Sequence, residues 1–357
     1  MTEYPIFDGH NDTVLHLIDS ETRDKRSFFE ESEVGHIDLP RAKQGGFAGG
    51  FFAMFVPNPA KVTEQLREAF KRGEEVSLPP PLELDYAQQK TFEMMRTLFD
   101  VEAQSDGQVK ITHTVDEIET CIETDVLAMV LHIEGAGMID TDFDLLEVLY
   151  QAGLRSLGIV WSRPNAFATG VPFKFPHSPD IGDGLTDDGK VLVKKCNEMG
   201  IMLDLSHLNE KGFWDVAKLS TAPLVATHSN VHALSPTPRN LTDKQLEAIK
   251  DSDGMVGLNF ATAFLREDGG KGLTAEERAE TPLSTMVAHI DYLVEAIGID
   301  RVGLGSDFDG AGIPKVVGDV AGLPNLIEAL QEAGYDDESL QKITHKNWTR
   351  VLRQTWV

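Results

Sequence analysis

The segment FDGHND at residues 7–12 ends a short apolar run and sets two polar side chains, His10 and Asp12, two positions apart. Successive side chains of an extended strand point to opposite faces, so an H-x-D pair projects both groups to the same side. Imidazole and carboxylate are together ligands that suit Zn²⁺. We therefore expect a metal site to begin here. The pattern is short and common, so its meaning depends on what the rest of the chain brings beside it.

Seven further runs of strand-forming residues follow this segment, and helical patterns separate them. Such alternation is typical of parallel strands joined by crossover helices. For this chain of 357 residues we predict an α/β fold, a single (β/α)8 barrel (TIM barrel) of the metal-dependent hydrolase type that spans residues 1–357. The eight runs are PIFDGH near residue 5, GGFFAMFV at 49–56, VLAMVLHIEG at 126–135, LRSLGIVW at 154–161, GIMLDLSH at 200–207, PLVATHS at 223–229, GMVGLNF at 254–260 and RVGLGSDF at 301–308.

Two stretches interrupt this alternation, one at about residues 57–84 with its triple proline at 79–81 and one at 163–186, rich in Pro, Phe and Gly. Both follow a predicted strand. Loops after the strands of such a barrel build the rim of the active site, so we expect these insertions to shape or cover the pocket. Helices are predicted over 85–104, 115–124, 142–152, 187–199, 210–219, 242–251, 282–297 and 337–354, where apolar residues recur every three to four positions.

The composition limits the partners of the chain. With 58 acidic residues against 32 Lys and Arg, the formal net charge is −26. That charge disfavours nucleic acid and anionic membranes, so we expect a small-molecule substrate. The sequence has no apolar stretch of about 18 residues and no basic, apolar leader. Its two cysteines, Cys121 and Cys196, are too few for a disulfide framework, which favours the cytoplasm.

Polar residues that can bind a metal fall at or just after the carboxyl ends of the apolar runs. In a parallel barrel those ends converge on one face, so residues far apart in the sequence meet in one pocket. His207 and His228, on adjacent predicted strands, supply two nitrogens for a second ion, and Glu134 has two oxygens with which to bridge the pair. Two metals about 3.5–4 Å apart can hold a bridging hydroxide. The residues at these ends are His10, Asp12, Glu134, His207, His228 and Asp307.

The roles of Asp307, Arg239 and His132 each have an alternative. Asp307 ends its run directly and is preferred to Asp309, which precedes a glycine and is expected to stabilise the turn. Arg239 in SPTPRN follows the His228 run on a proline-constrained loop, where a fixed guanidinium can bind a carboxylate through two hydrogen bonds; an ordinary surface arginine is the alternative. We expect His132 to be a buried, hydrogen-bonded histidine, with a supporting role behind the metal ligands as the alternative.

With these residues in place, the chain resembles the membrane (renal) dipeptidase family of zinc peptidases, peptidase family M19, within the amidohydrolase-like barrels. The matching segments run in the family's order from residue 7 to residue 310: FDGHND, HIEGAG, LDLSH, APLVATHSN followed by PRN, and GLGSDFDG. The resemblance implies two Zn²⁺ ions bridged by Glu134 and a hydroxide. It assigns His10 and Asp12 to one ion and His207 and His228 to the other.

The resemblance also implies the reaction, which is hydrolysis of the peptide bond of free dipeptides, including those with a C-terminal D-residue. The hydroxide would attack the carbonyl, Arg239 would meet the substrate carboxylate, and Asp307 would pass the proton to the leaving amine. One departure stands out. Where better-known members carry a histidine after the fourth strand, this chain has Trp161, which we assign to the substrate pocket. The mammalian relatives are secreted and lipid anchored, and this sequence shows neither signal.

Two alternatives remain open at this point. A related binuclear amidohydrolase would act on N-acyl-D-amino acids or on a cyclic amide; the charge of Arg239 favours a free carboxylate over a neutral ring. A catalytically impaired metal-binding relative would explain Trp161, but the intact Asp307 opposes that reading. The sequence leaves the side-chain and chirality preference, the native metal and a homodimer undecided.

Overall fold

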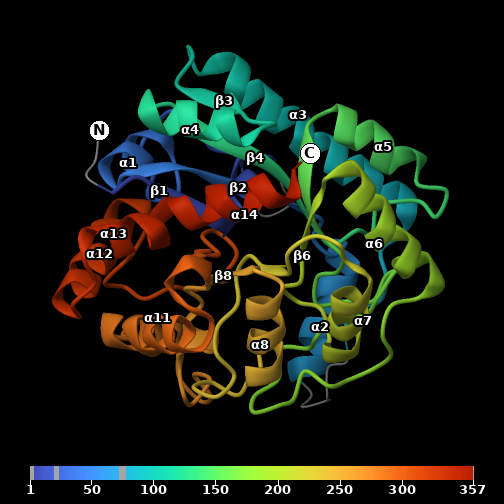
Figure 1. The fold of residues 1–357 in the computed structure, drawn as a ribbon. Coiled ribbons are helices and arrows are strands. Elements are labelled where there is room, and N and C mark those ends of the chain that lie inside the picture. The colour runs from blue at the N-terminus through green and yellow to red at the C-terminus, as the bar shows by residue number, and fades with distance from the viewer. Residues whose placement is uncertain (1–3, 20–23, 72–77, 357) are drawn as a thin grey trace.

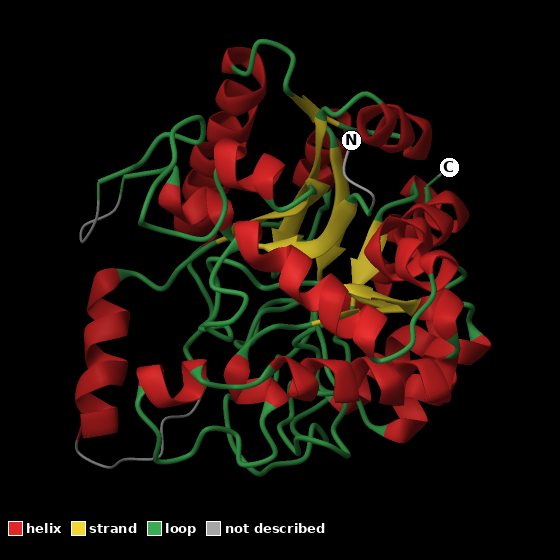
Figure 2. Ribbon diagram, turned by 90° about the vertical axis from the view of Figure 1, so that its left-hand side faces the viewer, coloured by secondary structure: helices red, strands yellow, loops and turns green. Residues whose placement is uncertain are grey.

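Parallel strands lie at the centre of the molecule, and helices surround them (Figures 1 and 2). The computed structural model describes residues 4–19, 24–71 and 78–356. Within them the barrel strands follow the order β2-β1-β9-β8-β7-β6-β5-β4, and β2 pairs with β4 to close the ring. The predicted TIM barrel is confirmed. Its strands are β1 (Ile6–Asn11), β2 (Phe47–Phe55), β4 (Leu127–Glu134), β5 (Leu154–Gly158), β6 (Met202–Asp204), β7 (Val225–Ala226), β8 (Met255–Leu258) and β9 (Val302–Leu304).

A further short strand, β3 (Val109–Ile111), lies outside the ring and was not predicted. It pairs with the first residues of β4, on the side where the later residues of β4 pair with β5. The sequence VKI buries its two apolar ends and exposes Lys110. Three residues of alternation are too few to stand out as a strand signal.

The predicted crossover helices are present around the ring, and side-chain caps fix several of their starts. Thr186 accepts a hydrogen bond from the Gly189 amide, and Thr242 forms a capping box with Gln245, as N-cap residues do. These helices are α3 (Leu84–Gln104), α4 (Val115–Glu123), α5 (Asp144–Gln151), α6 (Asp187–Met199), α7 (Glu210–Leu219), α8 (Asp243–Asp251) and α11 (Leu283–Ile297).

Other helical segments differ from the sequence-based expectation. The helix expected over 337–354 is divided by a π-helical turn, η4 (Lys342–Lys346), which separates α13 (Asp337–Gln341) from α14 (Asn347–Thr355). The remaining segments were not predicted, although α12 carries buried apolar residues at helical spacing. They are α1 (Leu39–Gln44), α2 (Ala60–Lys71), α9 (Thr262–Leu265), α10 (Ala275–Ala279), α12 (Leu323–Glu332) and the 3-10 turns η1 (Thr13–His16), η2 (Ile299–Arg301) and η3 (Val320–Gly322).

The two interrupting stretches differ from each other. Residues 57–84 contain the helix α2, although part of this stretch, 72–77, lies outside the described residues. Residues 163–186 contain no helix and only isolated bridges. The second stretch reaches the strand ends, because the Val171 amide donates to the carbonyl of His207 at 2.8 Å.

The side chain of Trp348 fills the barrel interior from the amino end, together with Phe7 and Phe51. Trp348 of α14 is fully buried, and its indole Nε1 donates to the carbonyl of Leu304 at 3.1 Å. Its ring packs edge-on against Phe51, with 5.3 Å between the ring centroids. A Cβ on Gly9 would overlap the same indole. In Figure 1, α14 crosses the middle of the molecule in front of the strands.

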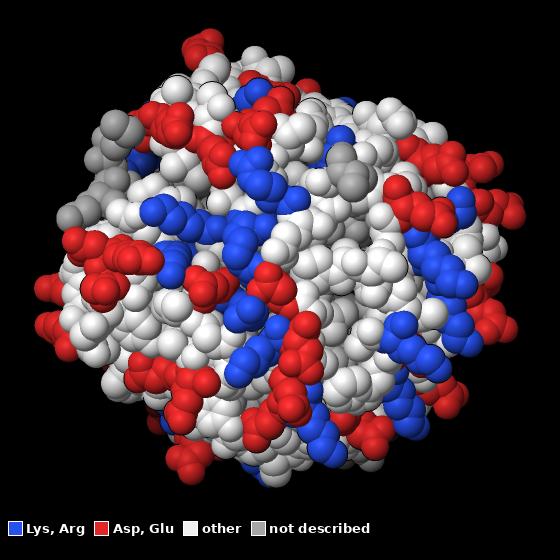
Figure 3. All heavy atoms as spheres, viewed as in Figure 1, with Lys and Arg blue, Asp and Glu red and all other residues white. Residues whose placement is uncertain are grey.

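On the face seen in Figure 3, basic and acidic side chains are interspersed. The helix α14, which crosses this face, contributes Arg350 and Arg353. Arg350 pairs with Asp253, and Arg353 pairs with Asp116 and Glu119. Among the described helices, none combines the length and the apolar character that a membrane crossing needs.

Candidate metal and substrate site

The six predicted strand-end residues meet at the carboxyl end of the barrel. His10 lies in β1, Glu134 is the last residue of β4, and the others follow β1, β6, β7 and β9 within three residues. Each is buried, with at most 8% of its surface exposed. Residues up to 297 positions apart in the sequence therefore share one buried cluster: His10, Asp12, Glu134, His207, His228 and Asp307.

Glu134 stands between two groups of ligands. Its Oε2 lies 4.0 Å from His10 Nε2, whereas its Oε1 lies 2.9 Å from His207 Nε2 and 3.8 Å from His228 Nε2. His10 Nε2 lies 3.5 Å from Asp12 Oδ2, and the Nε2 atoms of His207 and His228 are 3.2 Å apart. Ligand atoms about 2.0–2.2 Å from a tetrahedral zinc ion lie about 3.3–3.6 Å from one another. The spacing fits two ions that share Glu134.

The hydrogen bonding of the cluster also fits bound cations. Both ring nitrogens of His10 and Oδ1 of Asp12 are buried and have no hydrogen-bond partner among the described residues. A buried polar atom without a partner costs free energy, so each such atom needs an explanation. His10 also joins Asp12 and Asp307 in one potential cation site and Glu134 and His228 in another.

Burial and mutual repulsion explain the charges of the cluster. Burial raises the pKa of Glu134 well above its usual value, and the Asp12 carboxylate adds to the effect. Burial lowers the pKa values of His207 and His228 well below the usual range. Burial also lowers the pKa of His10, but the nearby Asp12 and Glu134 outweigh it and raise the value to about 10. Two neutral imidazoles and a set of crowded carboxylates are what a divalent cation requires.

The backbone at two of these residues is in an uncommon conformation. His207 has φ 67° and Asp307 has φ 59°, in the left-handed region that non-glycine residues rarely adopt. The Asp307 amide donates to the His10 carbonyl at 3.0 Å, which holds the turn in place. A Cβ on Gly310 would overlap the carboxylates of both Asp12 and Asp307. Such strain is retained where the surrounding structure enforces it, often at functional sites.

Arg239 is buried beside the same cluster, not on the surface. Its Nη2 donates to the carbonyl of His228 at 3.1 Å, and its guanidinium carbon lies 5.2 Å from the ring centroid of Phe264. Burial lowers its pKa, while the carboxylates of Asp307 and Glu134 favour its charged form. The surface alternative for Arg239 is therefore excluded, and a fixed positive charge faces the cluster.

Asn259 is a site residue that the sequence analysis missed. It follows β8 directly, and its Nδ2 donates to Asp307 Oδ2 at 2.8 Å. The same amide approaches the carbonyl of His228 at 3.3 Å. The signal was present, because Asn259 is the polar residue at the end of the run GMVGLNF. Among the described residues, no hydrogen-bond donor reaches Oδ1 of Asp307, while Asn259 occupies Oδ2.

Trp161 belongs to an aromatic wall beside His207. The two ring centroids are 6.1 Å apart, and Trp161 also contacts Phe55 and Phe173 at 5.0 Å and 5.5 Å. Arg163, also missed from the sequence, places its guanidinium carbon 5.0 Å from the Trp161 ring centroid. Arg163 is buried and donates through Nη2 to the Val56 carbonyl at 3.2 Å, and burial lowers its pKa to about 10.

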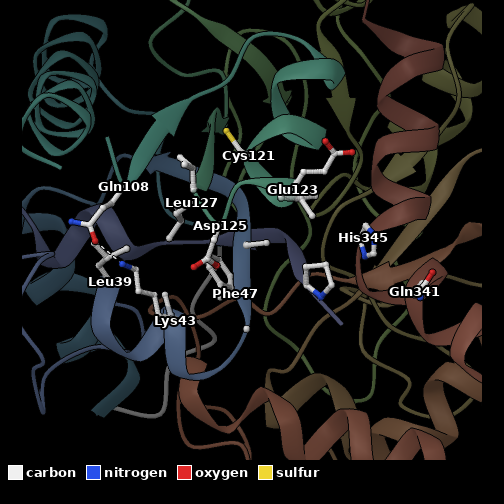
Figure 4. Close-up of a pocket in the computed structure, with 16 residues that line it drawn as sticks. Leu39, Lys43, Phe47, Gln108, Cys121, Glu123, Asp125, Leu127, Gln341 and His345 are labelled. Atoms are coloured by element: carbon white, nitrogen blue, oxygen red, sulfur yellow. Dashed lines mark hydrogen bonds between the residues drawn. The ribbon is translucent and has the colours of Figure 1, made fainter. Parts of the chain in front are cut away.

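A cavity of about 290 Å³ lies at the opposite end of the barrel (Figure 4). Phe47 and Leu127, the first residues of β2 and β4, line it together with residues of α1 and α4. Lys43 donates to Gln108 at 2.5 Å across its wall. None of the eight residues predicted for the site lines this cavity.

The closed parallel barrel with a buried His, Asp and Glu cluster at its carboxyl end is the fold and site of a metal-dependent hydrolase. An amidohydrolase from Pseudomonas aeruginosa shares the fold, with a TM-score of 0.75 at 20% identity over 99% of this chain and 97% of that one. The chain belongs to the membrane dipeptidase family, peptidase family M19, whose sequence profile matches residues 1–356. The predicted family and the predicted metallodipeptidase class are confirmed.

Several relatives are similar over most of their length. A metallopeptidase from Rhodobacter sphaeroides, solved with a phosphinate mimic of the dipeptide L-Ala-D-Ala, is 48% identical, with a TM-score of 0.92 over 99% of both chains. The structure of dipeptidase AC is 47% identical, with a TM-score of 0.91 over 99% of both. Dipeptidase tcpJ of Claviceps purpurea (strain 20.1) is 27% identical over 97% of this chain and 76% of its own length.

Proposed function

We propose that this protein is a two-zinc dipeptidase that hydrolyses the peptide bond of free dipeptides, including those with a C-terminal D-residue. The observation that carries the proposal is the position of Glu134, whose Oε2 faces His10 while its Oε1 faces His207 and His228. The substrate class is supported by the Rhodobacter sphaeroides relative, which was solved with a mimic of L-Ala-D-Ala.

In this proposal the ligands divide into two sets around Glu134. His10, Asp12 and Oε2 of Glu134 would hold one ion, while His207, His228 and Oε1 of Glu134 would hold the other. Bound zinc ions supply a water nucleophile of lowered pKa and a Lewis acid for the developing oxyanion. The buried neutral imidazoles provide the lone pairs that such ions need.

The other residues bind the substrate and move its proton. The fixed guanidinium of Arg239 binds the C-terminal carboxylate of the dipeptide, a charge-assisted contact that favours free acids over blocked ones. Oδ1 of Asp307 takes the proton of the attacking water and gives it to the leaving amine, because Asn259 already occupies Oδ2. Trp161 forms a wall of the substrate pocket with Phe55 and Phe173.

The cellular setting proposed from the sequence is the cytoplasm. Cys121 and Cys196 are both buried and form no disulfide. Such free thiols suit a reducing compartment.

A substrate panel tests the proposal. Zinc-loaded protein would be given L-Ala-L-Ala, L-Ala-D-Ala, N-acetyl-D-alanine and the cyclic alanine dipeptide, with metal analysis on the same sample. We expect turnover of the unblocked dipeptides and two zinc ions per chain. Cleavage of the N-acyl compound without cleavage of any free dipeptide would contradict the proposal and favour the related amidohydrolase activity.

Exchange of Asp307 for Asn isolates the proton-transfer step. Asn tolerates the left-handed backbone at this position better than most residues, so the fold should be preserved. We expect turnover to fall by about 10³-fold, within the range of general acid–base catalysis, while the zinc content stays the same. Unchanged turnover would remove Asp307 from the mechanism.

A further inference from the structure

Behind His228 lies a buried chain of polar side chains that the predicted ligand set does not use. Thr227 Oγ1 is 2.8 Å from His228 Nδ1 and 2.7 Å from Asp204 Oδ2. Asp204 is the last residue of β6 and Thr227 follows β7, and both side chains are inaccessible to solvent. The contacts form one line from Asp204 through Thr227 to the ring of His228.

The protons along this line have one consistent arrangement. Asp204 Oδ1 accepts the amides of Ser206 and Thr227, at 3.0 Å and 2.8 Å, and as an ionised carboxylate Asp204 can only accept at Oδ2 as well. The Thr227 hydroxyl therefore donates its single proton to Asp204 Oδ2, and its oxygen has to accept from His228. His228 then carries its proton on Nδ1, which leaves the Nε2 lone pair facing Glu134 and His207.

The other candidate histidine ligands lack this support. His207 Nδ1 lies 2.9 Å from Ser162 Oγ, but no carboxylate in the described parts of the chain accepts a hydrogen bond from Ser162. That hydroxyl is free to donate or to accept, so it fixes neither tautomer of His207. Neither ring nitrogen of His10 has a hydrogen-bond partner within the described residues. Of these three histidines, only His228 is backed by a carboxylate through a hydroxyl within the described part of the chain.

We propose that Asp204 and Thr227 are positioning residues that fix the tautomer and orientation of His228, and thereby set the affinity of the ion held by His207 and His228. The inference rests on the proposed two-zinc site. Partners of this kind orient a ligand and raise its basicity, and losing one typically costs about 10–100-fold in metal affinity. Ser162 supplies the same kind of contact to His207 without the carboxylate, so its contribution is smaller.

The substitution Asp204→Asn gives a specific prediction because it reverses the direction of the two hydrogen bonds that link residue 204, Thr227 and His228. The Asn oxygen would still accept the two backbone amides, which turns its NH₂ group toward Thr227. Thr227 would then accept from Asn and donate to His228 Nδ1, so the ring proton would move to Nε2. An isosteric exchange at a residue outside the ligand set would thus block the metal-binding lone pair, as a wrong tautomer does in catalytic triads.

His132 does not take over this role. Its Nε2 lies 3.8 Å from Asp204 Oδ2, too far for a hydrogen bond, and its Nδ1 lies 2.8 Å from Ser156 Oγ. The expectation of a buried, hydrogen-bonded histidine is met. Asp204 is therefore committed to Thr227 and, through it, to His228.

The experiment measures zinc affinity and histidine tautomers rather than turnover. Metal-free wild type, D204N, T227V, T227S and S162A would be titrated with zinc against a competing chelator. We expect one of the two affinities to fall by about 10–100-fold in T227V and by more in D204N. T227S, which restores the hydroxyl, should lie within about 3-fold of wild type, and S162A should lose less than T227V.

The ring nitrogen shifts of ¹⁵N-labelled metal-free protein supply the second readout. His228 should carry its proton on Nδ1 in wild type and T227S, on Nε2 in D204N, and on a mixture of both in T227V. A merely structural tie between β6 and β7 would lower stability in the variants but leave these tautomers and the zinc affinities unchanged, and that result would overturn the proposal. If wild type did not bind two zinc ions, the proposed function would fail. The nitrogen shifts of metal-free protein would still decide whether Asp204 and Thr227 fix the tautomer of His228.

Discussion

The two ends of the barrel differ in whether their buried polar groups have hydrogen-bond partners. At the carboxyl end, His10 is buried with both ring nitrogens unpaired among the described residues, and His207 and Asp307 hold left-handed backbones. At the amino end, the indole of Trp348 is buried with its donor satisfied by Leu304. Buried unpaired groups and strained backbone cost stability, whereas filled apolar space supplies it. Packing that stabilises the fold therefore lies toward the amino end of the barrel. The unpaired polar groups and strained backbone that cost stability lie at the carboxyl end.

The largest effect is expected from the exchange of Glu134 for Gln. An amide has one carbonyl oxygen, so it serves one ion, and we expect turnover to fall by about 10³-fold or more. Metal-free protein should at the same time become more stable, by on the order of 1 kcal/mol, because burial and Asp12 penalise the ionised carboxylate. Kinetics and urea unfolding without zinc measure the two effects. A less stable metal-free variant would mean that Glu134 supports the fold.

The exchange of Trp348 for Ala tests the packing of the barrel interior. Removing a fully buried indole should lower the free energy of unfolding by about 3–5 kcal/mol. Zinc affinity and kcat per folded molecule should stay at wild-type values, because the hydrogen bond and the ring contact of the indole are with Leu304 and Phe51 and not with the predicted ligands. Calorimetry and chelator titration at a temperature where both proteins are folded separate these outcomes. A change in zinc affinity would show that the two ends are energetically coupled.

If Arg239 binds the substrate carboxylate as proposed, its charge affects turnover and not the stability of the fold. Arg239→Met should lower kcat/KM for free dipeptides by about 10²-fold, mainly through KM, as expected for a lost charge-assisted contact. The matched control is a dipeptide amide, which has no carboxylate to lose. Wild type and variant should use the amide with similar efficiency; an equal loss on both substrates would argue against carboxylate binding.

His289 of α11 is a buried histidine whose ring nitrogens are both satisfied, by the Val231 amide and the Leu265 carbonyl. Burial lowers its pKa to about 4. The unfolded chain takes up this proton below about pH 6.5, so the contribution to stability is complete above that pH and is lost as the pH falls toward 4. Between pH 7 and pH 5, metal-free wild type should lose about 2 kcal/mol more than His289→Gln, which keeps both hydrogen bonds. Identical pH profiles in denaturant titrations would contradict this.

The fold and the core of the site could be predicted because both follow from where residues stand in the sequence. Apolar runs located the barrel strands, and polar residues at their ends identified His10, Glu134 and His228. The same rule pointed to Asn259, which was overlooked. The ligand roles given to His10, Asp12, Glu134, His207 and His228 stay predictions, and so do the roles given to Arg239, Trp161 and Asp307.

Other features could not be predicted from one-dimensional patterns. The hydrogen-bonded chain from Asp204 through Thr227 to His228 depends on the orientation of side chains on neighbouring strands. The spacing of residues in the sequence does not predict that orientation. The π-helical turn η4 leaves the periodicity of 337–354 nearly unchanged, so one continuous helix was the natural prediction. β3 is too short to produce a signal.

The position of Trp348 has a consequence for the synthesis of the protein. The indole packs on Gly9 and Gly303, near opposite ends of the sequence, and β1 pairs with β9. A ribosome adds about 5–20 residues per second, so the first strand waits roughly 20–70 s for the partner and the indole that enclose it. Throughout that interval the nascent chain presents an unfinished barrel to chaperones and proteases. A reading frame interrupted before codon 348 would leave that barrel permanently open at its base.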